Sequence, residues 1–71
     1  MVMKGEQVAL VAAFGAGIGA TTHSVGINTG NRVVDAAIGI GLAVAGWYID
    51  HDGVGDFVEG FGVGYFLASV L

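Results

Sequence analysis

The chain has 71 residues, no cysteine, no proline and a formal net charge of −4 at pH 7. The lack of cysteine excludes disulfides and zinc–thiolate sites, and the negative charge has the wrong sign for a protein that neutralises nucleic-acid phosphates. Hydrophobic residues make up 55% of the chain before its 14 glycines are counted, whereas soluble domains reach about 45–50% with glycine included, so a soluble monomer is the least favoured class.

The first apolar segment, 7–27, carries no charged side chain. As a helix it would be about 31 Å long, which matches the roughly 30 Å hydrocarbon core of a bilayer. We therefore expect a membrane-spanning helix here. Lys4 ahead of an apolar run also resembles a signal peptide, but the run is longer than such a segment needs, so we expect it to remain in the mature protein.

A polar patch, Thr21 to Ser24, interrupts this segment and contains His23. An ionisable residue within a membrane segment is a candidate proton relay or pore-facing group. The alternative is structural, because Thr and Ser hydroxyls can bond to carbonyls one turn back in a helix. We favour the structural interpretation and leave the other open.

The next stretch, 28–31, has the residues of a turn, and Asn31 can cap the helix that follows. We expect that helix at 32–49, with Trp47 and Tyr48 near its end as in a membrane interface. Arg32 and Asp35 share a face of its first turn. Arg32 could pair with a lipid headgroup, with Asp35 or with a carboxylate of an adjacent chain.

Acidic residues and glycine then break the second helix over 50–56. We expect a solvated turn that faces an aqueous space. A divalent metal is a weaker alternative, because the turn lacks the ordered oxygen spacing of a calcium loop and the paired histidines of a zinc site. Asp56 and Glu59 have the spacing of a capping box, so a third helix is expected at 57–71, antiparallel to the second in a helical hairpin.

Glycine and alanine recur every four residues on all three segments, a spacing that lets helices approach closely in lipid. We therefore predict an all-α fold, one domain of three helical segments. The glycines expected at close helix contacts are Gly15, Gly19, Gly41, Gly60 and Gly64. A β interpretation stays open because glycines also recur every two residues, although a membrane barrel would alternate apolar with polar residues. No β-α-β unit is present to make 15–19 a phosphate-binding loop.

The apolar segments 33–49 and 57–71, joined by the polar turn 50–56, resemble the small pilins of conjugative and DNA-transfer pili of the type IV secretion kind, including archaeal DNA-import pili. The preceding segment 7–27 extends the resemblance over most of the chain. It implies a non-enzymatic subunit, without a cofactor apart from bound lipid. Many copies, stored in the membrane, would assemble into a helical filament outside the cell.

In such a filament DNA would be transported cargo without sequence-specific binding, and the small-residue rows would pack subunit against subunit. The resemblance places four turn residues at the lumen: Asp50, His51, Asp52 and Asp56. Arg32 and Asp35 would serve a lipid headgroup or an ion pair between subunits. The chain departs from bacterial members in having an acidic turn where a basic one is common.

A second resemblance is to the proteolipid ring subunits of rotary ATP synthases, which have a glycine-rich first helix like 14–20. Those subunits carry a carboxylate in the middle of the second helix, whereas Asp35 and Asp50 flank the second segment here. A holin-like or toxin-like pore former is a further alternative. All these classes are small oligomeric membrane proteins.

Overall fold

The computed structural model describes residues 5–49 and 53–71, and within them it is all α-helical. The helices are α1 (Gly5–Ser24), α2 (Arg32–Tyr48) and α3 (Val54–Val70). The predicted all-α fold with three helical segments is therefore confirmed.

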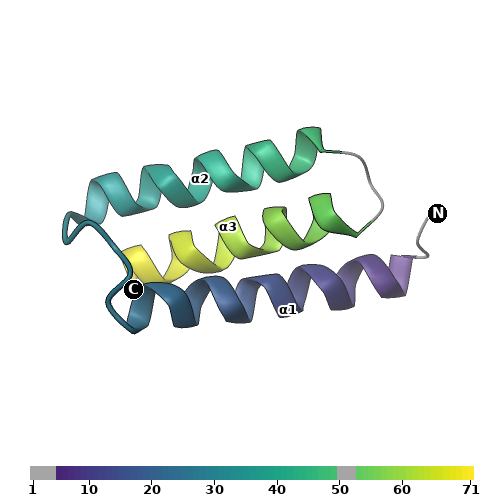
Figure 1. The fold of residues 1–71 in the computed structure, drawn as a ribbon, viewed down its shortest axis with the longest axis horizontal. Coiled ribbons are helices and arrows are strands. Elements are labelled where there is room, and N and C mark those ends of the chain that lie inside the picture. The colour runs from purple at the N-terminus through teal and green to yellow at the C-terminus, as the bar shows by residue number, and fades with distance from the viewer. Residues whose placement is uncertain (1–4, 50–52) are drawn as a thin grey trace.

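Helix α3 lies between the other two (Figure 1), and α1 and α2 each pack along it without packing on each other in the described ranges. Helix α2 runs antiparallel to α3, as the predicted hairpin requires, while α1 runs parallel to α3 (Figure 1). The result is a single layer of helices, with principal extents of 38 × 19 × 15 Å. Because none of the described residues forms a second layer, both broad faces of these helices remain open.

The turn between α1 and α2 follows from its local chemistry. Asn31 caps α2 as predicted, because its side-chain oxygen accepts hydrogen bonds from the amides of Val33 (3.0 Å) and Val34 (3.2 Å). Helix α1 ends at Ser24, three residues before the predicted end at 27. Gly26 has a φ of 100°, a conformation that cannot continue a right-handed helix.

Helix α3 begins at Val54, earlier than the predicted 57. Gly53, with a φ of 108°, occupies the N-cap and has no side chain to offer. The predicted capping box is therefore wrong, and Asp56 lies inside the first turn, only 6% exposed. The positive end of the helix dipole favours a carboxylate there. Of the predicted solvated turn, Asp50, His51 and Asp52 lie outside the described residues, and Asp56 is buried.

Glycine sets the distance between the helices. A Cβ atom built on either Gly15 or Gly19 would come within 3.0 Å of the α3 backbone, and one on Gly60 or Gly64 within 3.0 Å of the α1 backbone. These four predicted glycines thus lie in the contact between α1 and α3 of one chain. Gly41 makes no such contact within the chain, because nothing lies within 4 Å of the position that a Cβ atom would take there, and its place in a contact between subunits stays a prediction. The α2–α3 contact instead uses Gly39, Gly46 and Gly62.

Close backbone contact leaves the large side chains outside. Tyr65 is the one buried hydrophobic side chain among the described residues. Many large apolar residues are exposed on all three helices, including Leu10 (70%), Phe14 (67%) and Ile40 (51%). A row of aromatic rings, Phe14, Phe57, Phe61 and Tyr65, follows the junction of α1 and α3.

Within residues 5–49 and 53–71, no helix combines the length and apolar character needed to cross a membrane.

Candidate functional site

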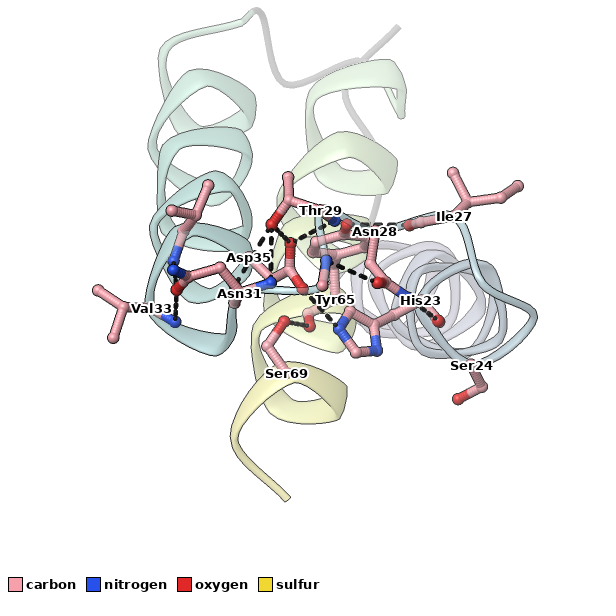
Figure 2. Close-up of polar contacts among 12 residues, drawn as sticks. His23, Ser24, Ile27, Asn28, Thr29, Asn31, Val33, Asp35, Tyr65 and Ser69 are labelled. Carbon is pink, nitrogen blue, oxygen red and sulfur yellow. Dashed lines mark hydrogen bonds and ion pairs between the residues drawn. The ribbon is translucent and has the colours of Figure 1, made fainter.

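The most concentrated polar structure of the described chain lies at the end of the layer where α1 stops and α2 starts (Figure 2). Asp35 is at its centre and is 2% exposed. His23 reaches it from the last turn of α1, and Thr29 from the connecting loop. Tyr65 of α3 lies beside them. We call these four residues the polar cluster.

Both carboxylate oxygens of Asp35 are bonded. Oδ1 accepts hydrogen bonds from the backbone N–H of Thr29 at 2.8 Å and from its hydroxyl at 2.5 Å. Oδ2 lies 3.2 Å from Nε2 of His23. An ionised carboxylate can only accept, so the imidazole nitrogen is the donor. Asp35 is also in the first turn of α2, where the helix dipole favours negative charge.

The same contacts fasten the loop between α1 and α2 over the end of α3. The hydroxyl of Tyr65 donates to the carbonyl of Ile27 at 2.9 Å, although the two residues are 38 positions apart. The Tyr65 ring also meets the imidazole of His23 edge-on, with centroids 5.1 Å apart. Asn28 adds a bond from its side-chain nitrogen to the carbonyl of His23 at 2.9 Å. The loop is therefore tied to α1, α2 and α3.

The electrostatics of the polar cluster follow from these bonds. The pKa of Asp35 is lowered from 3.8, chiefly because the Thr29 hydroxyl bonds to the carboxylate; burial opposes this shift, and the Thr29 amide and His23 add to it. The pKa of Tyr65 is raised from 10.0, first by burial and then by the negative charge of Asp35. At neutral pH the structure thus holds an ionised Asp35 beside a neutral Tyr65.

The neighbouring hydroxyls bond within their own helix. Thr21, Thr22 and Ser24 each donate to the carbonyl four residues earlier, at 2.7–2.8 Å. This is the structural interpretation predicted for the patch 21–24. His23 differs from its neighbours, because it bonds across to α2.

Arg32 and Asp35, one of the three pairings left open for Arg32, do not pair in the described structure. The side-chain partners of Asp35 are His23 and Thr29, and Arg32 is exposed at the start of α2. The Asp35 carboxylate is buried and bonded within the chain, and the expected contact of Arg32 or Asp35 with a lipid headgroup or another subunit stays a prediction. Sequence reasoning missed Thr29 and Tyr65 altogether, since no local pattern links either residue to Asp35.

Chemically, the polar cluster is a satisfied structural site. His23 and Thr29 bond to Asp35, Tyr65 bonds to the Ile27 carbonyl, and the His23 side chain is only 18% exposed. Among residues 5–49 and 53–71, no three His, Cys, Asp or Glu side chains are grouped so that they could hold a metal ion. The cluster can hold helices together and respond to protonation of Asp35.

Comparisons with protein families, curated proteins and solved structures found no match to this chain.

Proposed function

We propose that this chain is a structural subunit, a pilin-like protein that assembles in many copies into a helical, lipid-associated filament. The observation that carries the proposal is the single layer of helices, in which many large apolar side chains are exposed. Monomeric soluble proteins rarely expose large contiguous apolar surface, and such surface marks contacts with protein or membrane. Other copies of the chain and lipid tails are the partners that suit it.

The charge distribution supports the same proposal. Between the first turn of α2 and Ile49 there is no charged residue, and none follows Glu59 in α3. Long uncharged stretches on all three helices suit contact with like surfaces or with acyl chains, because a charge buried there would need a partner. We therefore propose storage at a lipid membrane before assembly and a filament at the cell surface afterwards.

DNA transfer is the proposed use of the filament, with DNA as cargo. The net charge of −4 suits transport without tight binding, because binding to nucleic acid depends on neutralising phosphates with Lys and Arg. The proposal includes no enzymatic activity and no cofactor apart from bound lipid. The turn residues Asp50, His51 and Asp52 remain proposed lumen residues.

Electron microscopy of sheared cell-surface material tests the proposal. Uniform helical filaments that contain this chain, with lipid extracted in stoichiometric amount, are the expected result. Irregular oligomers, together with lethality on expression, would instead identify the holin-like pore former. Closed rings whose proton transport is lost after treatment with a carboxyl-modifying reagent would identify the proteolipid alternative.

A further inference from the structure

The polar cluster gives α1 a direct bond to α2, and the fold makes this bond unusual. In the described structure α1 and α2 lie on opposite sides of α3 and do not pack on each other. The bond between His23 and Asp35 therefore reaches across the end of α3 (Figure 2). It joins the outer helices, which otherwise meet only through α3 and the loop.

The rest of the α1 contact depends on small residues. Gly15 and Gly19 meet the α3 backbone, and Gly60 and Gly64 meet the backbone of α1. Glycine contributes no side-chain burial, and a side chain as large as Phe14 remains 67% exposed. Hydrophobic stabilisation scales with the apolar area that is buried, so glycine contacts add little of it here or between α2 and α3. The two contacts differ in their polar bonds, because the Asp35 carboxylate bonds to His23 of α1 and to Thr29 of the loop. Polar bonds at one end can thus decide whether α1 stays docked.

We propose that the polar cluster is an acid-sensitive clasp: with Asp35 ionised it fastens α1 to the α2–α3 hairpin, and protonation of Asp35 releases α1 while the hairpin remains helical. The clasp acts within one chain and does not depend on filament formation. Once released, α1 uncovers the backbone of α3 at Gly60 and Gly64, which changes the surface that the chain offers to other copies.

Protonation of Asp35 would weaken the clasp because it removes hydrogen-bond acceptor capacity from the carboxylate. A neutral carboxyl group has one O–H donor and less acceptor capacity than a carboxylate, yet Asp35 faces donors from Thr29 and His23. The titratable groups that face Asp35 are His23 from α1 and Tyr65 from α3. Arg32, three residues earlier on α2, is exposed.

The direction of the pH effect follows from the pKa of Asp35, which is lower in the folded chain than the ordinary 3.8. A lowered folded pKa adds stability that is fully present above the ordinary pKa and is lost as the pH falls through the folded pKa. Docking of α1 should therefore weaken as the pH falls below about 4.

Hydrogen exchange of the full chain, dispersed as single copies in mild detergent, tests the clasp. Rates are converted to protection factors against the unfolded chain at the same pH. Below about pH 4 the protection of α1 amides should fall about tenfold or more while α2 and α3 retain theirs. The variant Asp35→Asn should show the same loss selectively in α1 already at neutral pH.

Two further variants separate a clasp from a general loss of folding. Tyr65→Phe removes the hydroxyl that holds Ile27 and should lower α1 protection in the same direction, with the ring still in place. Thr21→Val is the matched control, because the Thr21 hydroxyl bonds to the carbonyl of Gly17 within its own helix. It should therefore match the wild type at every pH tested, with α1 docked near neutrality and released below about pH 4.

Equal loss of protection in all three helices would overturn the proposal, because the cluster would then support the whole fold. Unchanged α1 protection in both Asp35→Asn and the acidified wild type would overturn it as well. If Asp35→Asn does not fold, the acid titration of the wild type and Tyr65→Phe still decide between these outcomes.

Discussion

At the scale of single residues, Gly64 shows how little room the α1–α3 contact has. A Cβ atom at this position would lie within 3.0 Å of the carbonyl oxygen of Ala16, which is backbone and cannot rotate away. Forced overpacking of this kind typically costs about 1–3 kcal/mol. We therefore expect Gly64→Ala to lower the free energy of unfolding by about that amount, measured by denaturant unfolding and circular dichroism.

Gly41 provides the matched control for Gly64. It lies in α2 with nothing within 4 Å of the position of an added methyl group. Since alanine favours a helix over glycine by roughly 0.5–1 kcal/mol, Gly41→Ala should stabilise the isolated chain. Equal destabilisation by both substitutions would contradict the contact geometry. A stable Gly41→Ala chain that no longer assembles would place Gly41 at a contact between subunits.

At the scale of elements, the start of α2 depends on one side chain. Asn31 accepts hydrogen bonds from two amides in the first turn, and losing such a cap typically costs about 1 kcal/mol. Asn31→Ala should therefore lower the free energy of unfolding by about that amount. Asn31→Asp should have little effect, because aspartate caps equally well. If denaturant unfolding shows the same loss of free energy of unfolding for both variants, the stabilising role of Asn31 is not helix capping.

Element boundaries show what local sequence could predict. The start of α2 was predicted correctly because a cap acts on amides two and three residues away. The end of α1 near Gly26 and the start of α3 near Gly53 differ from the predicted positions. Glycine can lie inside a helix, and the local sequence does not show at which glycine the backbone takes a positive φ. Asp56 was misassigned for the same reason, because an earlier helix start draws it into the first turn.

At the scale of the whole molecule, the open faces should govern assembly. Ile40 is 51% exposed in the uncharged part of α2. Ile40→Lys should change the stability of the single chain by less than about 0.5 kcal/mol, as surface substitutions usually do. If Ile40 lies at a contact between copies, the critical concentration for assembly should rise about tenfold or more, which corresponds to about 1.4 kcal/mol.

Sedimentation of assembled material over a range of chain concentrations measures this effect. Ser24→Lys is the control, because it adds the same charge at an exposed polar position at the end of α1. It should leave the critical concentration nearly unchanged. Equal effects of the two lysines would indicate a response to net charge, and no effect of either would exclude this part of α2 from the assembly contact.

By itself, the sequence determined the three helices, the cap at Asn31 and the lack of large residues where helices meet, because these follow from interactions within a few residues. Only the tertiary structure decided that α3 is the central helix and that Gly39 and Gly46, in place of Gly41, contact it. Because glycine is so frequent, small residues recur every four positions on several faces of each helix. Only the packing of the helices decides which of these faces forms the contact. The polar cluster also required the fold, since His23 and Asp35 are 12 positions apart and Tyr65 bonds to a residue 38 positions away.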